Sequence, residues 1–132
     1  MLLTDPIADL LTRVRNGYMA RLTKVQAPYS RIKEQILRIL KKNGYIASFE
    51  VIDLGNNKKD LAIELNNVRE TKYVPTLRRI SKPGQRIYVK ASEIKKSRNG
   101  HGIFIVSTPK GVITGYEAFA LKVGGELLCE IF

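Results

Sequence analysis

The sequence predicts an α+β fold, in which a small N-terminal domain of two helices and three strands packs against a mostly β C-terminal domain with one short helix. In the first 42 residues, hydrophobic side chains recur mainly at helical spacing, and from residue 46 onward they follow the spacing of strands. A polar and charged stretch at 66–72 lacks both periods and is the natural boundary. We therefore expect an N-terminal domain at 1–66 and a C-terminal domain at 67–132, which are reasonable sizes for two small domains sharing a core.

The first helix is expected to begin at Pro6, because a first helical turn tolerates proline. Asp5 or Thr4 would cap it, and it should end between Gly17 and Arg21. Its hydrophobic residues recur at helical spacing along one face: Ile7, Leu10, Leu11, Val14 and Tyr18.

A second helix is predicted after an extended segment at 24–28. Ser30 can cap it and Gly44 can end it. Lys41 and Lys42 fall in its last turn, where positive charge favours the helix dipole. One face of this helix is hydrophobic and consists of Ile32, Ile36, Ile39 and Leu40.

The remaining elements are predicted from strand-like alternation and from turn residues. A Gly55-Asn56-Asn57 turn would join strands at 46–54 and 61–65 into a hairpin. In the second half we expect a turn at 82–84, a loop through 98–100 and a short helix at 116–122. The strands expected there are 77–80, 86–90, 103–108, 112–114 and 126–131.

Charge indicates a polyanionic partner. The chain has 23 Lys and Arg against 12 Asp and Glu, a formal net charge of +11, and nucleic acid is the usual reason for such a balance. A solvated basic surface is the alternative, and a membrane is a weaker candidate because no basic segment carries a wide apolar helical stripe. The stretch 69–98 is densest, with a net +8 from Glu70, Glu93 and ten basic residues: Arg69, Lys72, Arg78, Arg79, Lys82, Arg86, Lys90, Lys95, Lys96 and Arg98.

The sequence gives little support for catalytic activity or for metal binding. Cys129 is the single cysteine, which excludes an intrachain disulfide and fits a reducing compartment, and His101 is the single histidine. A Cys-His nucleophilic pair would need the two side chains adjacent and a third group orienting the imidazole, so a loop histidine and a buried thiol is the simpler interpretation. Four zinc ligands are not available. We expect no enzymatic activity, no cofactor and no metal, and neither a signal peptide nor a membrane anchor is visible.

The segment Ser107-Thr108-Pro109-Lys110-Gly111 is the strongest candidate for a binding site. Short hydroxyl side chains donate and accept hydrogen bonds, a glycine lets main chain approach closely, and a lysine adds positive charge. The segment lacks the glycine spacing and the Lys-Ser or Lys-Thr pair of a nucleotide-binding loop. An ordinary hairpin turn is the alternative, and the two interpretations are compatible. Gly124-Gly125-Glu126 likewise resembles backbone shaped to meet a partner.

Two further groups are candidates for contacts. Tyr88 alternates with Ile87 and Val89, so it could stack on a base or ribose beside Arg86; packing at a domain edge is the alternative. Basic residues of the second helix fit either an exposed face or a weak phosphate contact near the helix start.

A series of motifs follows in order from one end of the chain to the other: Thr4-Asp5-Pro6-Ile7-Ala8-Asp9, Thr12-Arg13-Val14-Arg15-Asn16-Gly17, Ser81-Lys82-Pro83-Gly84-Gln85-Arg86-Ile87-Tyr88, Gly102-Ile103, Val106-Ser107-Thr108, Lys110-Gly111-Val112 and Gly124-Gly125-Glu126. With these motifs the chain closely resembles the family of the eighth protein of the bacterial small ribosomal subunit.

The resemblance implies a structural constituent of the small ribosomal subunit. It implies a primary RNA-binding protein that binds the central domain of 16S ribosomal RNA and helps assemble the platform, in the cytoplasm or in the ribosome of an organelle. Expected partners are that RNA domain and neighbouring small-subunit proteins, with a monomeric free state and no membrane. Carried over by position, the RNA-binding residues are Ser107, Thr108, Lys110, Gly111, Arg86, Tyr88, Gly124, Gly125 and Glu126, with secondary contacts from Thr4, Arg31 and Lys33.

This chain departs from the family pattern in two places. Pro109 replaces a third hydroxyl residue, which removes one expected hydrogen bond and stiffens the loop, and Gly115-Tyr116-Glu117 replaces a more basic stretch. Our hypothesis is that Ser107, Thr108 and backbone near Gly124 read an irregular RNA site while residues of 69–98 contact the phosphate backbone. An alternative function uses the same surface: an autoregulator that binds its own messenger RNA outside the ribosome.

Overall fold

The computed structural model describes residues 4–132 and divides the chain into two compact units. The helical unit is Pro6–Pro75, and the β unit is Thr76–Phe132 together with Thr4 and Asp5. The mixed helix and sheet content confirms the predicted fold class. The sequence suggests a boundary at residue 66, whereas in the structure the segment 67–75 belongs to the helical unit.

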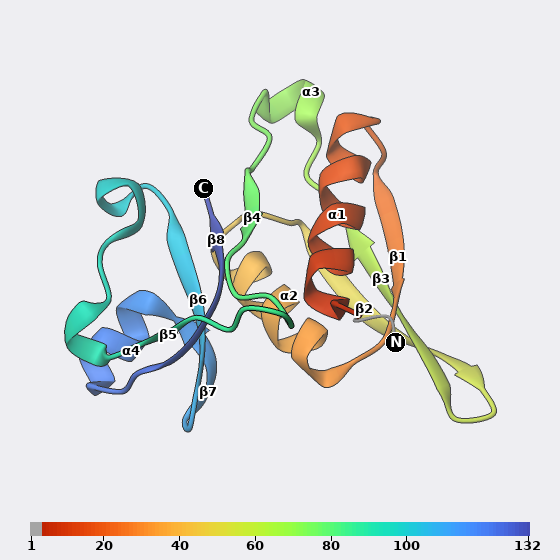
Figure 1. Ribbon diagram of the computed structural model, residues 1–132. Coiled ribbons are helices and arrows are strands. Elements are labelled where there is room, and N and C mark those ends of the chain that lie inside the picture. The colour runs from red at the N-terminus through yellow and green to blue at the C-terminus, as the bar shows by residue number, and fades with distance from the viewer. Residues whose placement is uncertain (1–3) are drawn as a thin grey trace. The chain divides into compact units, whose positions relative to one another are not determined.

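In the helical unit, helices α1 (Pro6–Met19) and α2 (Arg31–Lys42) cover one face of a three-stranded antiparallel sheet (Figure 1). The strand order is β1-β3-β2, formed by β1 (Lys24–Pro28), β2 (Ser48–Gly55) and β3 (Lys58–Glu64). The core between helices and sheet contains fully buried Leu10, Val14, Ile36, Leu40, Leu61 and Ile63. A short helix, α3 (Val68–Thr71), follows in a stretch where the sequence predicts only a linker.

Local signals in the sequence explain the ends of these elements. The Ser30 hydroxyl accepts a hydrogen bond from the Lys33 N–H and caps α2, as predicted. Asn56 and Asn57 have φ angles of 53° and 61°, which suits the two-residue turn of the β2–β3 hairpin because asparagine tolerates left-handed backbone. Asn67 caps α3 in the same way by accepting from the Arg69 N–H.

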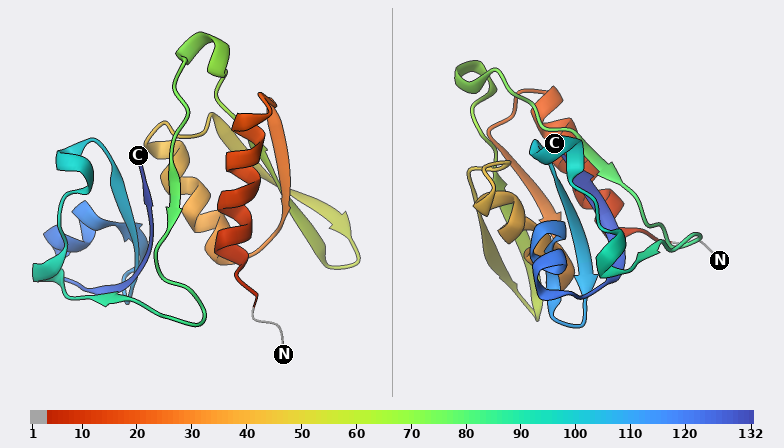
Figure 2. Two further views of the ribbon diagram at one scale, coloured as in Figure 1. Left: turned by 45° about the horizontal axis from the view of Figure 1, so that its top comes forward. Right: turned by 90° about the vertical axis from the view of Figure 1, so that its left-hand side faces the viewer.

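In the β unit, the last strand in the sequence lies in the middle of the sheet. The sheet consists of β4 (Leu77–Arg79), β5 (Tyr88–Val89), β6 (Ile103–Thr108), β7 (Gly111–Thr114) and β8 (Gly125–Ile131). Its order is β4-β8-β6-β7, and β5 also pairs with β8. Figure 2 shows β8 running beside β4 and β6. Helix α4 (Gly115–Leu121) and the short 3-10 helices η1 (Ala91–Glu93) and η2 (Ser97–Gly100) complete the unit.

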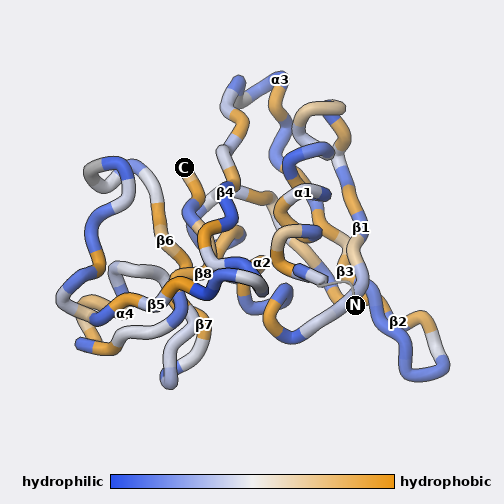
Figure 3. The backbone as a smooth tube through the Cα atoms, viewed as in Figure 1, coloured by the Kyte–Doolittle hydropathy of each residue, from blue (hydrophilic) through white to orange (hydrophobic). Residues whose placement is uncertain are grey.

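Strands β6 and β8 provide most of the core of the β unit, as the hydrophobic stretches along them in Figure 3 show. Ile105, Leu128 and Ile131 are fully buried there. The register between the strands shifts after Ile105, so that one extra residue is inserted on β8. Such a bulge changes the direction of side chains on the bulged strand, here β8, next to the segment that pairs with Val106 and Ser107.

The predicted strand at 86–90 is reduced to the two residues of β5, and the other predicted strands agree with the structure within a few residues. Within residues 4–132, none of the helices combines the length and hydrophobicity that crossing a bilayer requires. The same residues contain no cluster of His, Cys, Asp or Glu suited to a metal ion.

Candidate nucleic-acid interface

Three strands of the β unit align the main candidate residues side by side. Ser107 on β6 pairs with Glu126 on β8, and Glu126 pairs on its other side with Tyr88 on β5. Directly opposed residues of antiparallel strands point to the same face of a sheet, so these three side chains share one face. The structure therefore brings together residues that lie up to 38 positions apart in the sequence.

The tip of the β6–β7 hairpin is stabilised by Thr108. Its hydroxyl donates to the Gly111 carbonyl at 2.9 Å and accepts from the Lys110 N–H at 3.1 Å. Gly111 has a φ of +113°, which favours glycine. The proton of the Thr108 hydroxyl is thus used inside the turn. Within the part of the chain that the structure describes, the Ser107 hydroxyl has no hydrogen-bond partner, so Ser107 is the hydroxyl donor that this loop offers.

Gly124 and Gly125 allow neighbouring strands to approach closely. A Cβ atom on Gly125 would lie 2.0 Å from the Ser107 carbonyl oxygen, and one on Gly124 would lie 2.4 Å from the Val89 carbonyl oxygen. Any side chain at either position would therefore push β8 away from β6 or β5. These glycines determine the spacing of the strands that carry Ser107, Glu126 and Tyr88.

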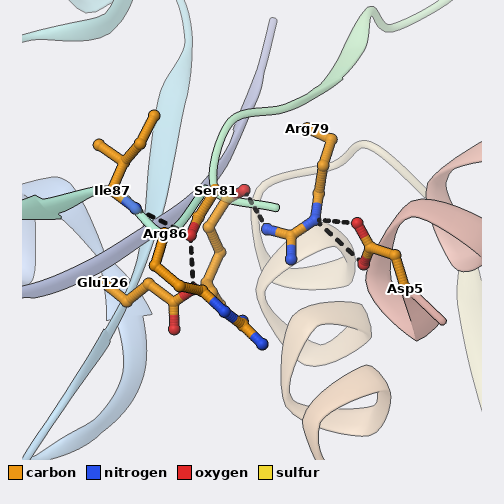
Figure 4. Close-up of polar contacts among 7 residues, drawn as sticks. Asp5, Arg79, Ser81, Arg86, Ile87 and Glu126 are labelled. Atoms are coloured by element: carbon orange, nitrogen blue, oxygen red, sulfur yellow. Dashed lines mark hydrogen bonds and ion pairs between the residues drawn. The ribbon is translucent and has the colours of Figure 1, made fainter. Parts of the chain in front are cut away.

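Glu126 is the centre of a polar network beneath this face (Figure 4). Its Oε2 accepts from the buried Ser81 hydroxyl and from Arg86 Nη1 at 3.0 Å, and the Ser81 oxygen accepts from the Ile87 N–H at 3.1 Å. Burial is the largest influence on the Glu126 pKa and raises it. The hydrogen bonds from Ser81 and Arg86 and the charges of Arg86 and Arg79 together outweigh burial, so the pKa is lowered from its ordinary value.

The N-terminal residues are attached to the same unit by Arg79. Its Nε donates to the Asp5 carboxylate at 3.0 Å and its Nη1 donates to the Leu128 carbonyl, as Figure 4 shows for Asp5. Thr4, the residue before Asp5, is exposed. The side chain of Arg79 is only 9% exposed, so this arginine is used to hold the unit together and is not accessible to a phosphate.

Tyr88 and Arg86 are both open to solvent. Tyr88 is 70% exposed, whereas its neighbours Ile87 and Val89 are partly covered, which agrees with the alternation that the sequence predicts. A ring this exposed packs little against the protein. Its exposure favours the stacking role over the alternative of packing at a domain edge.

The two secondary candidates on α2 differ from each other. Arg31 is exposed in the first turn, but Lys33 is buried, and its Nζ donates to the Pro28 carbonyl at 3.0 Å. The prediction of an exposed Lys33 is wrong, because the long aliphatic stem packs in the helical unit while the ammonium finds a backbone partner.

The basic stretch 69–98 is divided between the two units. Arg69 and Lys72 belong to the helical unit, and the other eight basic residues belong to the β unit. Three arginines are already paired with carboxylates: Arg78 with Glu130, Arg79 with Asp5 and Arg86 with Glu126. Arg98 stacks over the Phe132 ring at 3.9 Å. Considering only residues 4–132, five exposed lysines of this stretch have no ion pair: Lys72 in the helical unit, and Lys82, Lys90, Lys95 and Lys96 in the β unit.

Cys129 and His101 show no arrangement for nucleophilic chemistry. Cys129 is completely buried, and burial raises the pKa of its thiol to about 12 despite the opposing charge of Arg79. A thiol in this state is neutral and inert at physiological pH. His101 is exposed directly after η2.

These features define a class: a basic α+β protein with hydroxyl, aromatic and cationic groups on one sheet face. The chain belongs to the family described as ribosomal protein S8, whose model matches residues 5–132. Three curated relatives, each named small ribosomal subunit protein uS8, align over the whole of both chains. That of Chloroflexus aurantiacus is 48% identical over 133 residues, and those of Bartonella bacilliformis and Rhizobium rhizogenes are 46% and 43% identical over 132.

Membership of this family makes the protein a structural, non-enzymatic component of the small ribosomal subunit. There it associates with ribosomal RNA and with other ribosomal proteins. The family recognised from the sequence motifs is confirmed.

Proposed function

We propose that this protein is a primary RNA-binding protein that recognises an irregular helix in the central domain of small-subunit ribosomal RNA and helps build the platform. The alignment of Ser107, Glu126 and Tyr88 across β6, β8 and β5 is the observation that carries the proposal. It places the hydroxyl donor of Ser107 and the exposed ring of Tyr88 on one face. Arg86, which is paired with Glu126, lies beside them.

The chemistry of this face suits RNA. A-form helices present phosphates and ribose 2′-hydroxyls, and distorted regions also expose bases. The free Ser107 hydroxyl can bond a ribose or base, and Thr108 retains one lone pair for an RNA hydroxyl. Tyr88 can stack on an unpaired base. Arg86, oriented by Glu126, and the exposed Lys110 provide positive charge for phosphates.

The test is a comparison of two RNAs over a series of salt concentrations. The affinity of the protein for a central-domain fragment is measured against its affinity for a scrambled duplex of equal length. We expect both affinities to fall with salt, because cation-phosphate contacts release counterions, while a preference for the fragment of at least about a thousandfold persists.

Equal and equally salt-sensitive binding to both RNAs would reduce the protein to a generic polycation and would contradict the proposal. A fragment of the protein's own message, added as competitor, tests the autoregulatory alternative in the same experiment. Displacement of the ribosomal fragment at similar concentrations would show that the two RNAs use one surface.

A further inference from the structure

Helix α4 presents hydrophobic side chains that the β unit does not cover. Tyr116, Phe119 and Leu121 are 39%, 58% and 54% exposed. The first two line a mainly apolar hollow between α4 and the segment after η1, together with Ile94, Gly115, Lys95 and Lys96. Aromatic residues exposed around a hollow are typical of protein interfaces.

The walls of this hollow are fixed by the fold. A Cβ atom on Gly115 would lie 3.2 Å from Ile94 and 3.3 Å from the Phe104 Cβ, so α4 packs tightly at its start. The Tyr116 hydroxyl donates to the Gly102 carbonyl at 3.2 Å, which orients its ring. Because the hollow is already formed, the protein loses little conformational entropy when a partner side chain enters it.

The charges around the hollow determine which kind of partner can bind there. Lys95 and Lys96 are exposed at its rim. Glu117, the nearby acid on α4, caps the helix through Thr114. An occupant that complements this rim carries carboxylates next to an apolar side chain.

RNA fits this hollow less well than a protein segment does. Apart from the two lysines, its lining is apolar, and the hydroxyl of Tyr116 is directed to Gly102. Apart from Lys95 and Lys96, none of the six lining residues has a free polar group that could read a base edge.

We propose that this hollow docks an acidic segment of a neighbouring small-subunit protein, which inserts an apolar side chain beside Phe119 and places carboxylates on Lys95 and Lys96. The proposal does not depend on the RNA surface described above. Tyr116 is tied to Gly102, which precedes β6, whereas Ser107 lies near the other end of that strand, so both partners can bind at once.

Photo-crosslinking in assembled small subunits tests the proposal. Phe119 is replaced by p-benzoylphenylalanine, the subunits are irradiated and the crosslinked species are identified by mass spectrometry. The control places the same residue at Ala120, which is exposed on α4 but does not line the hollow. We expect position 119 to crosslink to a protein segment rich in Asp and Glu, with a yield several times that of position 120.

The charge requirement is tested by adding Lys95→Glu and Lys96→Glu to the crosslinking protein. Both lysines are exposed, so the fold should tolerate the changes, and circular dichroism and subunit incorporation are checked first. Reversing two exposed ion pairs should lower the yield by about fivefold or more. If the double variant fails to incorporate, Lys95→Gln with Lys96→Gln replaces it and should lower the yield less.

Three outcomes would overturn the proposal. They are a crosslink from position 119 to ribosomal RNA, a yield no higher than that of position 120, and a protein crosslink that the lysine substitutions do not change.

Discussion

Two adjacent hydroxyl residues have different tasks in this structure. Ser107 offers a free donor, whereas the Thr108 hydroxyl is bonded within the hairpin turn. The sequence treats them as equivalent parts of one loop, because residue type alone does not show which hydroxyl the turn uses. The structure therefore separates a residue with a free hydroxyl from a residue that shapes the loop.

Replacing Ser107 by Ala should weaken binding to the central-domain fragment by about five- to tenfold, the value of one hydrogen bond of about 1 kcal/mol. The free energy of unfolding should not change. Thr108→Val should lower both the affinity for the fragment and the free energy of unfolding, because it also removes the hydrogen bonds of the turn. Filter binding and urea unfolding measure the two effects, with Ser92→Ala, an exposed serine of η1, as control. A loss of stability in Ser107→Ala would contradict this division.

Glu126 should make the stability of the β unit depend on pH. Its pKa is lowered in the folded protein, so its stabilisation is present above the pKa of the unfolded chain, about 4.3, and is lost as the pH falls through the folded value. Glu126→Gln should lower the free energy of unfolding by about 1–2 kcal/mol at pH 7, because Arg86 loses its charged partner.

Urea unfolding at pH 7 and at pH 3 measures the difference between the Glu126→Gln variant and the unmodified protein. The difference should shrink as the pH falls through the lowered pKa of Glu126, because the native carboxyl then becomes protonated as well. Glu50→Gln, on the exposed side of β2, is the matched charge change and should have little effect at either pH. A difference that is independent of pH would contradict the role of the carboxylate charge.

Among the elements, those defined by neighbouring residues were predictable. Ser30 caps α2, and the asparagine turn of the β2–β3 hairpin lies where the sequence indicates. Elements that depend on distant residues were less accessible. The close approach of β8 to β5 and β6 depends on Gly124 and Gly125, because a Cβ atom at either position would overlap backbone of the neighbouring strand. The sequence identifies these glycines as candidates for RNA contact, but it does not reveal their steric role.

Gly125→Ala should destabilise the β unit strongly, by about 2–4 kcal/mol, since its Cβ would lie 2.0 Å from the Ser107 carbonyl oxygen. Gly55→Ala is the control: its φ is +82°, but a Cβ there meets no atom within 4 Å. It should cost only about 1 kcal/mol. Thermal unfolding measures the stability of both variants. An equal loss of stability in the two would mean that the spacing of the strands does not determine the effect of Gly125→Ala.

For the whole molecule, the number of basic residues overstates what an RNA can use. Of the 23 Lys and Arg, five arginines are paired with carboxylates among the described residues, and Lys33 is buried. The sequence correctly indicates a polyanionic partner from the charge, but it cannot separate paired arginines from free lysines. That separation depends on which carboxylates the fold brings near.

Lys110→Ala should reduce the slope of log K against log salt concentration by about one, for the central-domain fragment and for the scrambled duplex alike. A phosphate contact contributes to every RNA, so the preference between the two should hardly change. Ser107→Ala should do the opposite, with an unchanged slope and a reduced preference. Titrations at four or more salt concentrations distinguish these patterns, and a fragment-specific effect of Lys110→Ala would assign it to sequence readout.

The position of β8 affects how the protein is made. β8 follows β4, β5 and β6 in the sequence and pairs with all three. During translation these strands are therefore synthesised before the strand with which they pair. The helical unit, by contrast, is complete once Pro75 has emerged. A nascent chain therefore carries one finished unit and several unpaired strand edges, the state most exposed to aggregation. A chain that stops before β8 lacks the aligned face and cannot compete with intact molecules for a place in a growing subunit.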